Sequence, residues 1–267
     1  MGKISVVLAD WQVLFREGVH FTLSGEEDVE VIAEATDNDE ALEFIESNPP
    51  SIAVLNANHS ELSGIRVTRR IRQNFPSVSV ILVMDTDDEE QFFLAMKSGA
   101  SACLTKDTDP DELVDTIREV AQVGHPISEA LLRPGLAART LDEFEVFSQI
   151  NKQVNNLLAR LSPTETEILQ HIASGSPIEQ VSETLGISEL TIRHQLGLTL
   201  AKLVANDHNR EVMEIAQSVL PSTFFRAGKP SLEYVTREEF AAFRQNVTER
   251  LKSFISELNQ TRGGGKM

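Results

Sequence analysis

Cysteine and long apolar runs are nearly absent from this 267-residue sequence. Cys103 is the only cysteine, which excludes a disulfide within the chain and a zinc site built from several cysteines. The longest apolar runs are short, as from Val80 to Met84, whereas a membrane-spanning helix needs ~20 apolar residues. The first residues show no apolar signal segment. We therefore expect a cytoplasmic protein that has no membrane partner.

Positive charge is also scarce. The formal net charge is −17, and almost all of the excess lies in one half. Residues 1–125 carry a net charge of −15, whereas residues 126–267 carry −2. This asymmetry indicates two unlike domains. The first half would repel a polyanion such as nucleic acid, and the second half would tolerate one.

The first half alternates short apolar runs with segments of helical periodicity. The runs cover residues 4–9, 29–33, 52–55, 79–84 and 102–104, and the helical segments lie near residues 15–23, 40–45, 65–75, 88–97 and 110–123. This alternation predicts an α/β fold, a doubly wound five-stranded parallel sheet with helices on both faces. In such a sheet the functional crevice lies at the carboxyl ends of the strands.

The residues at those strand ends belong to recognisable motifs. The motifs are Leu8-Ala9-Asp10, the helix from Gly64 to Arg72, and Ser98 to Ser101 followed by Leu104 to Pro110. With them, residues 3–123 resemble the receiver domain of response regulators of the NarL/FixJ family. The positions that correspond to the family's phosphorylation site are Asp10, Trp11, Asn56, Met84 and Lys106.

The resemblance implies a defined chemistry at these positions. In the family two adjacent acids hold Mg²⁺, an aspartate accepts the phosphoryl group, and a hydroxyl and a lysine respond to it. Here Asp10 and Lys106 match, but Trp11, Asn56 and Met84 do not. An amide cannot form an acyl phosphate, and a single acid is a poor magnesium site. We therefore interpret the site as degenerate, with no metal or cofactor and with Asp10 and Lys106 as a remaining salt bridge.

A linker is predicted from Pro126 to Gly135, and an apolar stripe follows it. The stripe runs from Leu141 to Leu161 at helical spacing, which predicts a connector helix of roughly 20 residues. Two interpretations stay open. The stripe packs onto its own domain, or it pairs with the same helix of a second chain.

The next segment carries helix-start signals. Ser162-Pro163-Thr164-Glu165 and Ser176-Pro177-Ile178-Glu179 each have the pattern of a capping box with proline at the first helical position. Gly186 then supplies a tight turn, and Ser188 caps a third helix. These signals predict an all-α helix-turn-helix domain. Residues 161–203 resemble a LuxR-type DNA-binding domain, and the order of the two halves is that of the NarL/FixJ family.

Candidate DNA contacts lie on the third helix of this domain. They are Thr191, Arg193, His194, Gln195 and Lys202. Residues 160–215 nevertheless carry a net charge of −4, although DNA affinity rests on cations that neutralise phosphates. We therefore expect a phosphorylation-independent transcription regulator. The alternative is an adaptor or scaffold that uses both folds for protein contacts. Enzymatic activity is not expected, because the sequence shows no catalytic triad, zinc motif or phosphate loop.

The C-terminus continues beyond the length that is usual in the family. A capping box at residues 236–239 precedes an amphipathic helix with a near-heptad stripe of Phe240, Phe243, Val247, Leu251, Phe254 and Leu258. Such a stripe must be buried against another surface. The alternatives are the body of its own chain, such as the stripe from Leu141 to Leu161, a second copy of the chain in a homodimer, or another protein. The chain is thus divided into a receiver-like domain (1–125), a linker and connector (126–160), a helix-turn-helix domain (161–215) and an extension (216–267).

Overall fold

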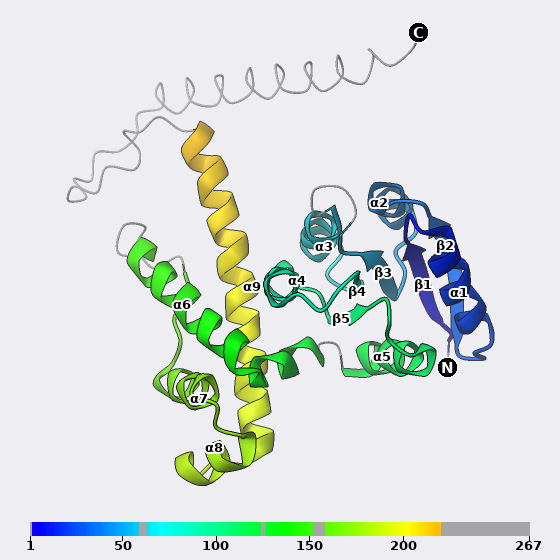
Figure 1. Ribbon diagram of the computed structural model, residues 1–267. Coiled ribbons are helices and arrows are strands. Elements are labelled where there is room, and N and C mark those ends of the chain that lie inside the picture. The colour runs from blue at the N-terminus through cyan, green and yellow to red at the C-terminus, as the bar shows by residue number, and fades with distance from the viewer. Residues whose placement is uncertain (1, 59–62, 124–125, 152–157, 220–267) are drawn as a thin grey trace, which may run out of the picture. The chain divides into compact units, whose positions relative to one another are not determined.

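The computed structural model describes residues 2–58, 63–123, 126–151 and 158–219 (Figure 1). One compact unit spans Met1–Arg210, and the contacts reported below lie within it. The stripe predicted at Phe240 to Leu258 lies outside the described residues, so its pairing remains a prediction.

The first half forms the predicted parallel sheet. Its strands are β1 (Ile4–Ala9), β2 (Val29–Ala35), β3 (Ile52–Asn56), β4 (Ser79–Met84) and β5 (Ala102–Thr105). Every pairing is parallel, and the strand order is β2-β1-β3-β4-β5. From β1 the chain adds β2 on one side and then returns to add β3, β4 and β5 on the other. The carboxyl ends of β1 and β3 therefore flank the functional crevice.

Five helices cover the two faces of the sheet. They are α1 (Val13–Ser24), α2 (Asn38–Ser47), α3 (Ser63–Asn74), α4 (Glu89–Ser98) and α5 (Pro110–Val123). Helices α1 and α5 lie on one face, and α2, α3 and α4 lie on the other (Figure 1). Because both faces are covered, all five residues of β3 are buried. The predicted fold class is confirmed.

The second half is helical, as predicted, but its first elements differ from the prediction. It contains a 3-10 helix, η1 (Pro126–Leu132), and the helices α6 (Pro134–Asn151), α7 (Pro163–Ala173), α8 (Ile178–Leu185) and α9 (Glu189–Val219). The segment predicted as a linker is therefore largely helical, and Ile127 and Leu131 of η1 are buried. These two side chains give the segment a packing role.

The connector helix also differs from the prediction. We expected it over residues 141–161, but α6 begins at Pro134 and ends at Asn151, and residues 158–162 are not helical. The side chain of Asn206 accounts for the last point, because it donates to the carbonyl of Ala159 at 2.9 Å and accepts from its N–H at 2.7 Å. Phe144 and Phe147 of the stripe are buried, with ring centroids 5.8 Å apart. This burial favours packing of the stripe onto its own chain.

The helix caps follow the sequence signals in two of three cases. Ser162 and Glu165 form the predicted capping box of α7, and the Ser188 hydroxyl accepts from the N–H of Thr191 at 3.1 Å. The box predicted at Ser176 is wrong. Pro177 adopts an extended conformation as N-cap of α8, which therefore begins one residue later than the pattern requires. Between α8 and α9, Gly186 has φ = +64°, a conformation that favours glycine.

Candidate functional site

The carboxylate of Asp10 lies at the carboxyl end of β1 and is 1% exposed. Its Oδ1 accepts a hydrogen bond from the backbone N–H of Gln12 at 2.7 Å. Its Oδ2 accepts one from the Nδ2 group of Asn56 at 2.7 Å. Asn56 ends the neighbouring strand β3 and is equally buried. The residue at the phosphoryl-acceptor position is therefore a hydrogen-bond donor to Asp10.

Lys106 completes this cluster. Its Nζ lies 3.3 Å from Oδ2 of Asp10 and 2.8 Å from Oδ1 of Asp85. The ion pair expected between Asp10 and Lys106 is thus present. Asp85 was missed by the sequence analysis, although its place directly after β4 puts it at the same sheet edge. The lysine is held between two carboxylates.

The other two strand-end residues make the crevice more apolar. Trp11 is 48% exposed, and the Nζ of Lys106 lies 5.7 Å from the centroid of its ring. A second aromatic ring, that of Phe15, lies 5.4 Å from the same ammonium group. Met84 is buried and offers no hydroxyl, but its carbonyl accepts from the N–H of Lys106 at 3.0 Å. Cation–π contacts therefore add to the ion pairs that fix the lysine.

Close packing supports the geometry around Asn56. A Cβ atom at Gly64, in the first turn of α3, would overlap the carbonyl oxygen of Asn56. The same carbonyl accepts from Nδ2 of Asn38 at 2.8 Å. The glycine allows α3 to begin against the end of β3, which keeps the amide of Asn56 in line with Asp10.

The residues of this crevice do not fit the Mg²⁺ ion that the fold family implies. Magnesium requires several oxygen ligands in an octahedral arrangement. Asp10 is the single carboxylate at the end of β1, and both of its oxygens already accept hydrogen bonds. The groups that contact the Asp10 carboxylate are the N–H of Gln12, the amide N–H₂ group of Asn56 and the ammonium group of Lys106, and all three are donors. Among the residues that the structure describes, no group of three His, Cys, Asp or Glu side chains is placed to hold a metal.

The candidate DNA contacts lie at the N-terminal end of α9. Thr191 and His194 are exposed, and Gln195 is partly exposed. Arg193 forms an ion pair with Glu129 of η1. This pair was not predicted, because Glu129 lies in the segment that we expected to be a linker. In this arrangement the cation at the centre of the predicted DNA surface is already neutralised.

Lys202 has a role within the helix-turn-helix fold. Its Nζ lies 2.6 Å and 2.8 Å from the two carboxylate oxygens of Glu165, which is buried. Burial opposes ionisation of Glu165, but the hydrogen bonds from Lys202 and Ser162 outweigh it and hold the pKa of the carboxyl below its usual value. The ion pair of Lys202 with Glu165 thus links α9 to α7. Its predicted contact with DNA phosphate remains a prediction.

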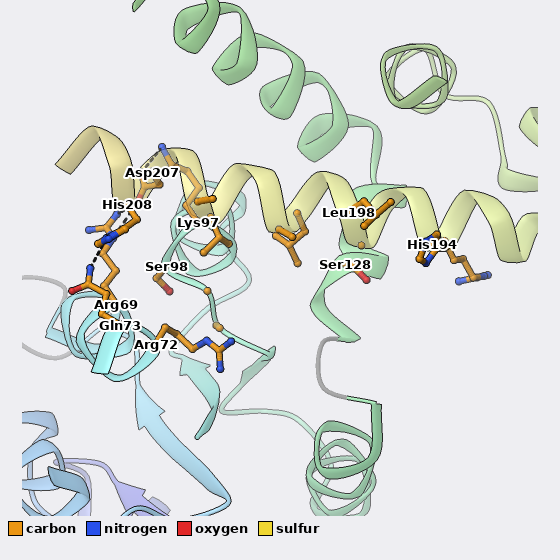
Figure 2. A pocket seen from close by; sticks show the side chains of 18 residues that line it. Arg69, Arg72, Gln73, Lys97, Ser98, Ser128, His194, Leu198, Asp207 and His208 are labelled. Carbon is orange, nitrogen blue, oxygen red and sulfur yellow. Dashed lines mark hydrogen bonds and ion pairs between the residues drawn. The ribbon is translucent and has the colours of Figure 1, made fainter. Parts of the chain in front are cut away.

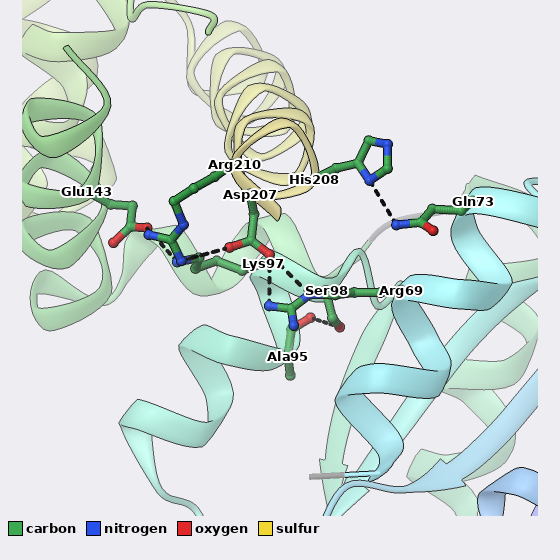
Figure 3. Close-up of polar contacts among 9 residues, drawn as sticks. All are labelled: Arg69, Gln73, Ala95, Lys97, Ser98, Glu143, Asp207, His208 and Arg210. Carbon is green, nitrogen blue, oxygen red and sulfur yellow. Dashed lines mark hydrogen bonds and ion pairs between the residues drawn. The ribbon is translucent and has the colours of Figure 1, made fainter. Parts of the chain in front are cut away.

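A buried charge network joins the two halves within the unit Met1–Arg210 (Figure 3). The side chain of Lys97 on α4 is 5% exposed, and its Nζ lies 2.5 Å from Glu143 of α6 and 3.2 Å from Asp207 of α9. Arg69 of α3 approaches Asp207 to 2.8 Å. Arg210 lies 3.2 Å from Glu143 and 3.5 Å from Asp207. These contacts join residues far apart in the chain, so no local sequence pattern predicts them.

No described helix combines the length and apolar character needed to cross a bilayer. The described part of the chain is instead a receiver-type α/β fold followed by a helix-turn-helix, which is the architecture of a two-domain bacterial regulator. Comparison with known proteins gives the family. Residues 6–118 match the response regulator receiver domain, and residues 159–215 match the bacterial regulatory proteins of the LuxR family.

Curated relatives match across both halves. The transcriptional regulatory protein DegU of Brevibacillus brevis is 33% identical over 218 residues, which cover 79% of this chain and 92% of DegU. The nitrate/nitrite response regulator NarL of Escherichia coli strain K12 is 28% identical over 199 residues, which cover 74% of this chain and 88% of NarL. A solved DNA-binding response regulator of the LuxR family from Staphylococcus aureus is 24% identical, with a TM-score of 0.43, and covers 45% of this chain and 99% of its own. The chain belongs to the NarL/FixJ family and is a LuxR-type response regulator.

Proposed function

We propose that this chain regulates transcription by binding DNA through the N-terminal end of α9, and that it does so without phosphorylation of its receiver-like domain. It acts in the cytoplasm as a regulator and not as an enzyme. The observation that carries the proposal is the hydrogen bond from Asn56 to Asp10. In this hydrogen bond the residue at the phosphoryl-acceptor position, Asn56, donates to the one acid that remains of the family's site, Asp10.

Three features of the crevice support independence from phosphorylation. An amide is not a nucleophile for phosphoryl transfer. The indole of Trp11 replaces the second acid, so the charge of a transferring phosphoryl group would lack its magnesium counterion. Lys106 is already compensated by Asp10 and Asp85. The crevice therefore resembles a receiver whose charges are balanced without a phosphoryl group.

The pairing of Arg193 with Glu129 opposes DNA binding, because the carboxylate offsets the charge of the guanidinium and occupies one of its N–H donors. Arg193→Ala should weaken specific binding by ~1–3 kcal/mol if the side chain reads a base edge. Glu129→Gln should strengthen binding, because it frees the arginine. Fluorescence anisotropy with a labelled operator measures both effects.

The matched control is Glu183→Gln, which removes the same charge from an exposed position on α8. It corrects for the general effect of a less acidic protein on DNA affinity. If Glu129→Gln and Glu183→Gln raise the affinity equally, the ion pair does not limit access of Arg193 to DNA.

Genomic footprinting of the tagged full chain in its host separates this function from its alternative. A transcription regulator gives discrete sites that disappear in the Arg193→Ala variant. The adaptor or scaffold, which the net charge of −4 over residues 160–215 favours, gives none. Absence of DNA binding by the purified chain at low salt would decide for the adaptor.

The proposal includes a homodimer formed through the C-terminal extension. Two chains would present two recognition helices, and the gain in effective concentration would offset weak binding by each. Deletion of residues 236–267 should therefore shift the protein toward a monomer in light scattering and weaken DNA binding more than it lowers the melting temperature. An unchanged mass in solution and an unchanged DNA affinity would reject the dimer.

A further inference from the structure

A cavity of about 760 Å³ lies between the receiver-like helices α3 and α4 and the helix α9. Figure 2 shows Arg72 on α3, Lys97 on α4, and His194 and Leu198 on α9 around it. Its volume is in the range of sites that take small organic molecules, ~300–1,000 Å³. All of its lining residues belong to the unit Met1–Arg210.

The lining carries several cations, although the protein as a whole is strongly acidic. They are Arg69, Arg72, Lys97 and Arg193. Arg69 and Lys97 pair with Asp207, Lys97 pairs also with Glu143, and Arg193 pairs with Glu129, so among the described residues Arg72 is the lining cation that no carboxylate offsets. The rest of the wall is partly apolar and includes Leu198 and Val204 of α9. An occupant with an anionic group and an apolar body would complement both parts of the wall.

Arg72 is the cation that most requires an anion. Its NH1 group donates to the carbonyl oxygens of Pro76 at 2.9 Å and of Val78 at 3.2 Å. No carboxylate of the described residues pairs with it. The side chain is half-buried, and this burial lowers the pKa of the Arg72 guanidinium from its ordinary value. A half-buried cation that is hydrogen-bonded only to neutral carbonyls is a favourable partner for an incoming anion.

We propose that this cavity binds a small organic anion, a carboxylate or phosphate on an apolar body, with Arg72 as the residue that receives the anionic group. None of the residues that line this cavity belongs to the crevice of Asp10, Asn56 and Lys106. It gives the receiver-like domain an input that needs no phosphoryl chemistry.

The ligand and DNA compete for the same residues of α9. Arg193 and His194 line the cavity and are also predicted to contact DNA. A ligand that touches α3 and α9 together stabilises the arrangement in which these residues face the receiver-like domain. The bound ligand therefore lowers the affinity for DNA. Because the coupling is reciprocal, bound DNA lowers the affinity for the ligand by the same factor. This second step rests on the proposed function, whereas the binding site itself does not.

Isothermal titration calorimetry of the full chain with 1-naphthyl phosphate tests the site, with 2-naphthol as a neutral probe of the same ring size. We expect saturable binding of one phosphate probe per chain and at least tenfold weaker binding of the alcohol, since a hydrogen bond to a charged group contributes ~1.5–3 kcal/mol. Arg72→Gln should weaken the phosphate probe by at least about tenfold for the same reason.

Two further variants make the titration decisive. Gly197 lines the cavity, and a Cβ atom there would meet nothing within 4 Å, so Gly197→Leu can place a bulky side chain at the cavity wall and should abolish binding by obstructing the site. Arg70→Gln is the matched control, because Arg70 lies on the same helix but pairs with Glu46 outside the cavity. Equal binding of both probes, or binding that survives Gly197→Leu, would overturn the site.

The competition is measured separately, as DNA affinity at a saturating concentration of 1-naphthyl phosphate. We expect weaker DNA binding in the wild type and no effect of the probe in Gly197→Leu. An unchanged affinity in the wild type would overturn the competition. Because the calorimetric titration contains no DNA, its outcome is independent of whether the chain binds DNA at all.

Discussion

Asp207→Asn should lower the free energy of unfolding by about 3–5 kcal/mol, because it removes the carboxylate that Arg69, Lys97 and Arg210 share. Glu143 remains as the carboxylate beside Lys97 and Arg210. Lys97 and Asp207 have side chains that are 5% and 4% exposed, so water cannot replace the lost partner. Arg69 loses the same carboxylate. Urea denaturation followed by circular dichroism measures the change.

The matched control is Asp39→Asn. Asp39 pairs with Arg66 at 3.0 Å, but both side chains are more than half exposed, so the expected loss is only ~0–1 kcal/mol. If the two substitutions cost the same, the network around Asp207 does not hold α9 against the receiver-like domain, and its charges are as well solvated as a surface pair.

Asn56→Asp should destabilise the protein and should not restore phosphorylation. It replaces the donor that faces Asp10 at 2.7 Å by a second carboxylate, at a position that is 1% exposed. The lost hydrogen bond to a charged group alone contributes ~1.5–3 kcal/mol, and repulsion between like charges adds to it. Trp11 still leaves the crevice one acid short of a magnesium site.

The pH dependence of this variant identifies the cause. Repulsion raises the pKa of one of the two carboxyl groups in the folded state, so the folded state binds a proton more readily than the unfolded state. The stability deficit relative to the wild type is then largest at neutral pH and shrinks as the pH falls and that carboxyl takes up a proton. A deficit that is the same at pH 4 and pH 7.5 would point to a packing defect and not to charge.

The sequence was sufficient for the parts of the molecule that depend on local pattern. The strands appeared as apolar runs because both faces of the sheet are covered, and the cap of α7 could be predicted because Ser162 and Glu165 are three residues apart. The pairing of Asp10 with Lys106 followed from the resemblance, since parallel strands end at one edge.

The sequence was insufficient where distant segments decide the structure. Asp207 received no role from the sequence, because nothing near it in the chain indicates that Lys97 and Arg69 surround it. The end of α6 was predicted too late, because the apolar spacing continues beyond the point where Asn206 holds the backbone of Ala159 in a non-helical form. Arg193 looked available for DNA, because the role of Glu129 depends on where η1 packs.

The central claim is that this response regulator acts on DNA without phosphorylation. The most direct test is the affinity of the full chain for a footprinted operator, measured before and after incubation with acetyl phosphate and Mg²⁺, with the intact mass recorded on the same samples. The hydrogen-bonded pair of Asn56 and Asp10 predicts an unmodified mass and the same Kd in both samples. A phosphoryl group on residues 1–125 together with tighter DNA binding would contradict it.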